Sequence, residues 1–285
     1  YGEPENVTAL NISWTREQYQ WERMSTLDPS QFDLTATDRN YRTDLEQVGL
    51  AFRTADYANG GQGNQVPPDG MDLPWNDPNN HWGMFLHQLA LSRLPTPSGR
   101  AAGDRNPVAH WTIWNEPDIC VQGHPGFSWN TAQRAADYLK LLRTGWHAVK
   151  SADPTLGVVF GSIGIVDADC DVDKTGMSFF NEFMNEADKD PITSATNEFY
   201  FNAMSLNLHK EPERIGEMVK KYSRALSEVE SQSGGAEKKE VWLMEMGIPT
   251  STEPIDPKTN GGLVATPEEQ KHFLWQGYAN ALIAG

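Results

Sequence analysis

The sequence has no long hydrophobic run and no recognisable targeting segment at its start. No stretch reaches about 18 consecutive apolar residues, the length that predicts a transmembrane helix. The N-terminus also lacks a basic segment followed by an apolar one, which is the pattern of an export signal. We therefore expect no membrane-spanning segment, and we expect any export signal to have been removed or never included.

Positive charge is scarce as well. The chain has 23 Lys and Arg residues against 39 Asp and Glu residues, which gives a formal net charge of −16. Nucleic acids and anionic membrane surfaces attract basic proteins. The charge therefore opposes nucleic acid and membrane partners and is neutral toward uncharged glycans.

Cysteine is nearly absent, and the seven histidines are scattered. Cys120 and Cys170 are too few for a metal-binding framework. Among the histidines, His81 and His87 are six positions apart and His110 stands alone, so no pair has the spacing of metal ligands. The glycine-rich segment 60–63 is not followed by the Lys-Ser/Thr of a phosphate-binding loop. We predict neither a metal nor a cofactor.

What the sequence does contain is an apolar run, 108–114, that ends abruptly in Asn115, Glu116 and Pro117. Its β-favouring residues predict a buried strand. Pro117 disfavours the helical conformation for the residue before it and cannot continue a central strand. Glu116 should therefore lie where the strand ends.

A second apolar run, 240–246, has the same character. It ends in Glu245 shortly before Gly247, and the alternation of a strand places Val241, Leu243 and Glu245 on one face. The two glutamates are far apart in sequence. In a parallel barrel, however, the carboxyl ends of the strands gather at one face, where the active sites lie.

Hydrophobic periodicity predicts strands and helices in alternation, which is typical of the α/β class. At 285 residues the chain fits one α/β barrel domain over 1–285. The predicted strands are 10–16, 50–57, 108–114, 157–162, 199–208 and 240–246. The predicted helices are 38–48 (capped by Asp38 and closed by Gly49), 82–90, 131–151, 177–187, 212–231 and one that starts at Thr266-Pro267-Glu268-Glu269 and runs to the end.

Two motifs carry a family resemblance over most of the chain, from about Asn11 to Gly285. Trp-Asn-Glu-Pro at 114–117 and Met-Glu-Met-Gly at 244–247 resemble the acid/base and nucleophile strands of clan A retaining glycoside hydrolases, most like family 39 or family 5. The resemblance implies a (β/α)8 TIM-type barrel. The six predicted strands match the second to the seventh of that barrel, so the first would precede Tyr1 and the eighth would follow Gly285.

The resemblance also implies roles for individual residues. The function would be hydrolysis of β-linked oligo- or polysaccharide, of xylan or glucan type, by double displacement. Glu116 would be the acid/base and Glu245 the nucleophile. Asn115 would contact the sugar 2-hydroxyl, and Arg16 would help to hold the nucleophile.

The sixth barrel strand departs from the family pattern. Relatives commonly end this strand in His-x-Tyr, with the tyrosine hydroxyl bonded to the nucleophile, whereas this chain has Asn207-Leu208-His209. His209 could supply that hydrogen bond, or it could indicate an altered or lost activity. Asn207 and His209 are therefore candidate substrate-binding residues. Trp21 joins them, because indole rings stack on sugar faces.

A second interpretation stays open: a non-catalytic barrel that binds carbohydrate or serves as a structural domain of a larger secreted assembly. We expect a carbohydrate substrate as the partner and an extracellular or cell-surface location. In the barrel, Cys120 and Cys170 would lie in loops on the active-site face, where a disulfide is an open alternative. The sugar, exo or endo action and the oligomeric state do not follow from the sequence.

Overall fold

A computed structural model describes residues 14–26, 31–33, 46–94, 107–119, 133–164, 177–189, 197–209, 212–232, 238–247 and 265–284. In this part of the chain, six strands form one parallel sheet in the order of the sequence. They are β1 (Trp14–Gln20), β2 (Glu46–Phe52), β3 (Val108–Asn115), β4 (Gly157–Gly164), β5 (Ala203–Leu208) and β6 (Glu240–Met246).

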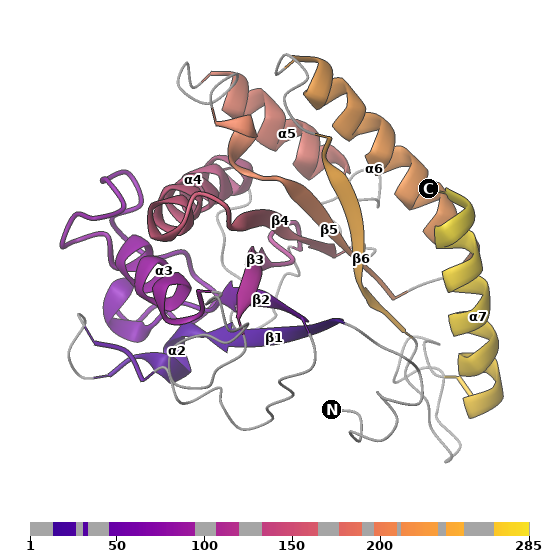
Figure 1. Cartoon of the computed structure of the whole chain (residues 1–285), viewed down its shortest axis with the longest axis horizontal. Coiled ribbons are helices and arrows are strands. Elements are labelled where there is room, and N and C mark those ends of the chain that lie inside the picture. The colour runs from indigo at the N-terminus through magenta and orange to yellow at the C-terminus, as the bar shows by residue number, and fades with distance from the viewer. Residues whose placement is uncertain are drawn as a thin grey trace.

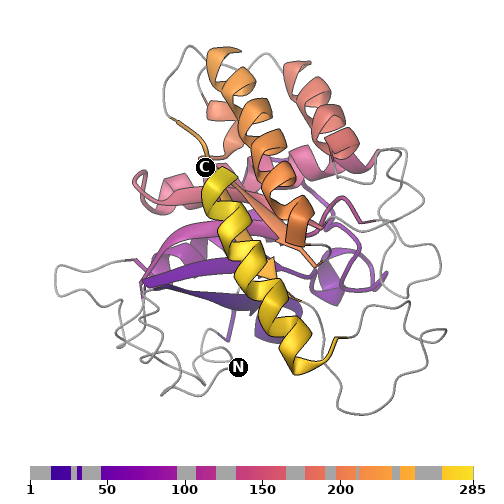
Figure 2. The same ribbon diagram turned by 90° about the vertical axis from the view of Figure 1, so that its right-hand side faces the viewer.

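Helices connect the strands and cover the outer side of the sheet (Figure 1). They are α2 (Trp21–Met24), α3 (His81–Ser92), α4 (Arg134–Ala152), α5 (Met177–Asp188), α6 (Pro212–Gln232) and α7 (Pro267–Ala284), with short 3-10 turns at Asp56–Ala58 and Glu198–Tyr200. Figure 1 shows α3 to α7 as an arc around the strands, and Figure 2 looks onto α7. The sheet is thus a curled half-barrel with alternating helices, as in part of a TIM-type barrel.

The two edge strands of this sheet face each other across the curl. Arg16 of β1 forms an ion pair with Glu245 of β6, although 229 positions separate them. Nearer the starts of these strands, the His110 ring on β3 lies between the two edges. Its centroid is 6.2 Å from that of the Trp14 ring on β1 and 5.0 Å from that of the Trp242 ring on β6. Side chains therefore fill the space inside the curl and join its two edges.

The sequence prediction was wrong between residues 46 and 57. Residues 46–49 were expected to end a helix closed by Gly49, but they form the first half of β2, and β2 ends at Phe52. A methyl group placed on Gly49 would lie 2.5 Å from the ring of Trp111 on β3. Glycine is needed here because the indole occupies the space over the strand. It does not cap a helix.

The helix predicted from Thr266 is confirmed, including its capping box. The Glu269 N–H donates to Thr266 Oγ1 at 3.3 Å, and the Thr266 N–H donates to Glu269 Oε2 at 2.7 Å. No helix in the described ranges is long and apolar enough to cross a bilayer. Asp38, the expected start of the helix predicted over 38–48, lies outside the described residues, as do Cys120 and Cys170. That helix start and the disulfide therefore stay predictions.

The end of β3 departs from regular strand geometry. Ile113 faces Gly145 of α4, and the next residue, Trp114, packs against Trp82 of α3 at a ring distance of 6.0 Å. Consecutive residues of a regular strand point to opposite faces. The left-handed φ of +72° at Trp114 and of +48° at Glu116 accounts for the exception. Residues held in this region mark strained positions, which cluster at functional sites.

Tyr138 of α4 stabilises this irregular strand end. Its buried hydroxyl donates to the Ile113 carbonyl at 3.0 Å and accepts the Gly161 N–H at 2.6 Å, which links β3 to β4. The regular pairing of these strands skips Trp114 and resumes at Asn115. The hydroxyl therefore provides a link where the ladder is interrupted.

We expect Tyr138→Phe to lower the free energy of unfolding by about 1–3 kcal/mol, because buried backbone groups lose the hydroxyl as a partner. Urea denaturation monitored by tryptophan fluorescence measures the change. Tyr278→Phe is the control, since Tyr278 on α7 is 61 % exposed and water can replace its hydroxyl as a hydrogen-bond partner. Equal losses in the two variants would contradict the role assigned to Tyr138.

Candidate active site

The described strand ends bring two glutamates and a histidine together. Glu116 follows the last residue of β3, Glu245 lies near the end of β6, and His209 follows β5. One carboxylate oxygen of each glutamate and one ring nitrogen of His209 all lie within 4.8 Å of one another. The two carboxyl groups that the sequence analysis proposed as a pair are therefore close enough to act on one bond.

Two basic side chains hold Glu245. His209 Nε2 lies 3.3 Å from Glu245 Oε2, and the Arg16 guanidinium donates to Oε1. The Glu245 side chain is 31 % exposed, so these partners act in a partly desolvated setting. The hydrogen bond from His209, followed by the charge of Arg16, lowers the pKa of Glu245 to about 2. Glu245 is therefore a carboxylate over nearly the whole pH range.

Glu116 has the opposite environment. Burial raises its pKa, and the negative charge of Glu245 adds to this, while the hydrogen bond from Asn207 opposes it. Two carboxyl groups close to each other thus have pKa values shifted in opposite directions. Such a separation of pKa values suits a site in which one carboxyl group donates a proton and the other stays ionised.

Asn207 is a buried bridge within the site. Its Nδ2 donates to Glu116 Oε1 at 2.9 Å and lies 3.5 Å from Asn115 Oδ1. The side chain is fully buried. The structure therefore places Asn207 against the carboxyl of Glu116, whereas the sequence analysis had expected it to contact substrate.

Trp21 does not belong to the site, and its proposed role in sugar stacking was wrong. Its side chain is 0 % exposed, and its ring stacks on Phe85 at 5.3 Å and packs against Trp82 at 5.5 Å. An indole enclosed on its faces by other aromatic rings has no surface left for a sugar. The side chain is part of the core between α2 and α3.

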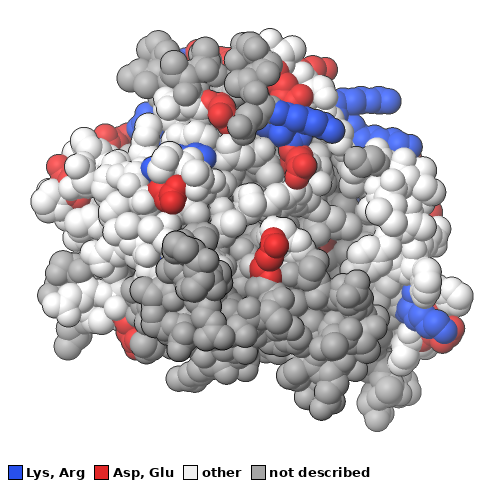
Figure 3. Space-filling model, in the orientation of Figure 1, with Lys and Arg blue, Asp and Glu red and all other residues white. Residues whose placement is uncertain are grey.

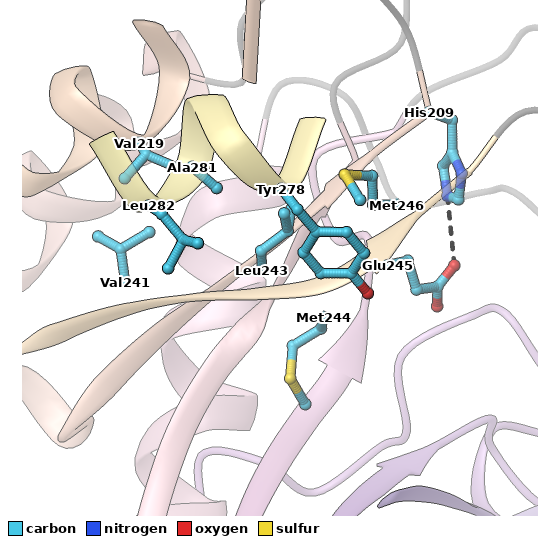
Figure 4. Close-up of a pocket in the computed structure, with 10 residues that line it drawn as sticks. All are labelled: His209, Val219, Val241, Leu243, Met244, Glu245, Met246, Tyr278, Ala281 and Leu282. Atoms are coloured by element: carbon cyan, nitrogen blue, oxygen red, sulfur yellow. Dashed lines mark ion pairs between the residues drawn. The ribbon is translucent and has the colours of Figure 1, made fainter. Parts of the chain in front are cut away.

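A groove runs from the site along β6 beneath α7 (Figure 4). Its cavity volume is about 600 Å³, within the range of small-molecule pockets. Figure 4 shows Glu245 and His209 at one end and apolar side chains at the other. These apolar residues include Val241, Leu243 and Leu282.

The face shown in Figure 3 carries charges of both signs. Lys and Arg side chains lie toward the upper right, at the lower right and at the upper left of this face, and Asp and Glu side chains lie among them. No strongly basic patch is visible among the described residues on this face.

A metal ion would have one candidate position in the described part of the chain, between Glu116, His209 and Glu245. The Arg16 guanidinium already donates to Glu245 there. A cation would have to compete with this fixed positive charge. We assign no metal to the site.

The similarity of this chain to known proteins lies in its fold. No protein-family model matches the sequence, and no curated protein matches it. Several solved structures, however, match the structure of this chain. A family 39 glycoside hydrolase from Bacteroides cellulosilyticus has a TM-score of 0.54 at 14 % identity, with 94 % of this chain and 48 % of that chain covered. This chain shares the fold of that structure over nearly its whole length.

Two further structures agree. The family GH53 catalytic domain of Ignisphaera aggregans has a TM-score of 0.53 at 13 % identity and covers 100 % of this chain and 75 % of its own. A glucosidase from Croceicoccus marinus has a TM-score of 0.51 at 13 % identity, with 91 % and 51 % covered. The chain thus spans about half to three quarters of the length of these glycoside hydrolases, and the likeness at this identity is one of fold.

The sequence analysis missed two residues that support the site. Asp118 is 4 % exposed and accepts the Gly164 N–H with Oδ1 at 2.9 Å, and Tyr138 links β3 to β4 as described above. The signal for Asp118 was its position two residues after Glu116, directly behind Pro117. No sequence signal pointed to Tyr138, which lies on the buried face of α4 like its apolar neighbours.

Proposed function

We propose that this chain carries the catalytic centre of a retaining β-glycoside hydrolase, with Glu116 as acid/base and Glu245 as nucleophile. The observation that carries the proposal is the pair itself, since oxygens of the two carboxyl groups lie within 4.8 Å. Carboxyl groups about 5–5.5 Å apart serve retaining enzymes, whereas inverting enzymes need about 6.5–9.5 Å to admit a water molecule. The spacing supports double displacement.

The chemistry follows from the two environments. Glu245, ionised and held by Arg16 and His209, attacks the anomeric carbon while Glu116 protonates the departing glycosidic oxygen. The C1–O bond breaks as the C1–Oε bond forms, and Glu116 becomes a carboxylate. It then removes a proton from a water molecule whose oxygen bonds to C1 as the C1–Oε bond breaks, which releases Glu245 as a carboxylate and regenerates the acid. Arg16 and His209 keep the free Glu245 carboxyl ionised before it attacks.

Asn115 would contact the sugar 2-hydroxyl beside the bond that breaks. The substrate class we propose is β-linked oligo- or polysaccharide of xylan or glucan type, at an extracellular or cell-surface location. Uncharged glycans suit a chain with a net charge of −16, which disfavours polyanions.

The test is a trapping experiment with the purified protein. A panel of 2-deoxy-2-fluoro β-glycosides with dinitrophenolate leaving groups should produce a stable glycosyl-enzyme, read as a mass increase, and peptide mapping should locate the sugar on Glu245. Hydrolysis of the matching β-glycosides, followed by NMR, should release the β-anomer first. Release of the α-anomer would overturn the retaining mechanism, and binding without turnover would favour the non-catalytic barrel.

The pH dependence gives a further prediction, which concerns His209. The enzyme needs Glu245 ionised and Glu116 protonated, so the acid limb of kcat/KM follows the pKa of Glu245, about 2. His209→Phe removes the largest cause of this low value, so the acid limb should move up toward 4.5 while Arg16 retains part of the effect. Turnover should fall as well, because the nucleophile loses a hydrogen bond that orients it.

His272→Phe provides the matched control for this prediction. His272 lies on α7, 76 % exposed at its side chain, with Nε2 3.7 Å from Glu268, so it is also a histidine beside a glutamate. Its substitution should leave the profile unchanged. An acid limb that stays in place in His209→Phe would remove His209 from the site.

A further inference from the structure

The residues that follow Glu116 form a tight turn that is fixed on two sides. The Ile119 N–H donates to the Glu116 carbonyl at 3.2 Å, which closes a four-residue turn with Pro117 in the second position, where proline is favoured. Asp118 occupies the third position. Its backbone carbonyl accepts a hydrogen bond from the buried guanidinium of Arg134, at the start of α4.

The side chain of Asp118 connects this turn to the neighbouring strand. Its Oδ1 accepts the N–H of Gly164, the last residue of β4, at 2.9 Å. The contact is buried, since Asp118 is 4 % exposed. Burial raises the pKa of the Asp118 carboxyl well above its usual range. A carboxyl buried at such a cost, with a backbone N–H on the next strand as its partner, indicates a structural task near Glu116.

Gly164 in turn provides the space in which Glu116 lies. A methyl group placed on Gly164 would be 2.7 Å from Cγ and 2.8 Å from Cδ of Glu116, and 2.7 Å from Cδ1 of Ile119, closer than real side-chain contacts. Gly164 is not among the glycines with a left-handed φ. Its backbone would therefore accept alanine, and the reason for glycine here is space for the side chains of Glu116 and of Ile119 in the turn that follows it.

We propose that Asp118 and Gly164 are positioning residues that hold the carboxyl of Glu116 between Asn207 and Glu245. The proposal rests on the proposed function of Glu116 as acid/base. Asp118 fixes the turn after Glu116 to the end of β4, and Gly164 leaves the space beside β4 that the side chain of Glu116 occupies. Together they set the direction in which the acid points.

The consequence is specific to proton donation. The acid must lie within hydrogen-bond reach of the glycosidic oxygen, and a displacement of about 1 Å in such a group can reduce the rate about 10²-fold. In Gly164→Ala the new methyl group would push Cγ and Cδ of Glu116 aside and lengthen the 2.9 Å bond from Asn207. The nucleophile Glu245, held by Arg16 and His209, would keep its place.

The experiment compares two substrates that differ only in their leaving group. In Gly164→Ala, kcat/KM should fall about 10²-fold for an alkyl β-glycoside, which needs the acid. It should fall much less for a 2,4-dinitrophenyl β-glycoside, whose leaving group needs no proton. Asp118→Ala should show the same pattern, and Asp118→Asn, which keeps an oxygen for the Gly164 N–H, should recover most of the loss. Equal losses on both substrates would overturn the proposal.

A second measurement does not depend on activity. With 13C-labelled glutamate, NMR titration should show a changed pKa for the Glu116 carboxyl in Gly164→Ala and no further change when Asn207→Ala is added, because the contact is already lost. Gly49→Ala, which also crowds a buried strand but meets Trp111, is the control and should leave this pKa unchanged. If no glycoside is cleaved but the Glu116 titration changes in Gly164→Ala, the proposed function is contradicted and the positioning role is not. An unaltered Glu116 titration in Gly164→Ala would overturn the positioning role.

Discussion

Replacing Glu245 by glutamine should abolish glycoside hydrolysis, with kcat/KM falling on the order of 10⁴-fold or more, the scale of losing a covalent nucleophile. The amide cannot form the glycosyl ester, and it offers the Arg16 guanidinium a weaker, uncharged partner. Steady-state assay with a 2,4-dinitrophenyl β-glycoside measures the loss. An activated leaving group does not compensate here, because the missing group is the one that attacks.

Azide distinguishes loss of the nucleophile from general damage. In Glu245→Ala, azide can enter the space left by the carboxylate and attack C1 directly, while Glu116 protonates the leaving group. A β-glycoside should then yield the α-glycosyl azide, identified by NMR. Glu240→Gln, on the same strand but bonded at 2.9 Å to Trp242 Nε1, is the matched control and should keep full activity. A β-azide from Glu245→Ala would contradict the assignment.

The strands that carry the two glutamates were the part of the fold that sequence could predict. Pro117 stops β3, and the short apolar run 240–246 coincides with β6. The periodicity of α3 and α5 was equally clear, because each has one apolar face toward the sheet. Local pattern was sufficient where one physical requirement, burial or chain termination, decided the structure.

Prediction failed where a contact between distant residues determined the local structure. Gly49 has the signal of a helix end, yet it is a strand residue because Trp111 from another strand covers it. Trp21 has the composition of a sugar platform, yet Phe85 and Trp82 enclose it. In each case the determining partner lies more than 30 positions away, beyond the reach of any local pattern.

The residues of the candidate site also differ in whether a local motif or a contact between distant residues determines them. Glu116 and Glu245 could be named from their motifs, but the support of Glu116 depends on Asn207, Asp118 and Gly164, which meet only when β3, β4 and β5 are adjacent. The left-handed φ of +48° at Glu116 likewise has no signature in the residue type. Motifs identify the reacting groups, and tertiary contacts set their direction and pKa.

Replacing Glu116 by glutamine should reduce kcat/KM by about 10²–10⁴-fold for an alkyl β-glycoside, the usual contribution of general acid catalysis. The same variant should keep most of the rate of the first step, formation of the glycosyl-enzyme, on a 2,4-dinitrophenyl β-glycoside. The leaving group of that substrate departs without a proton. The alkaline limb of the pH profile, set in the native protein by the raised pKa of Glu116, should disappear. Stopped-flow assay of the dinitrophenolate burst and steady-state pH profiles measure both effects.

Glu17→Gln tests whether a raised pKa alone makes an acid. Burial also raises the pKa of Glu17 on β1, with Arg93 opposing it, but no hydrogen bond joins Glu17 to the described side chains of the site. Its substitution should leave kcat/KM for both substrates, and the alkaline limb of the pH profile, unchanged. A profile that lost its alkaline limb in Glu17→Gln and kept it in Glu116→Gln would exchange the two assignments. The proposed role of Glu116 as the acid thus rests on its proximity to Glu245 together with its raised pKa.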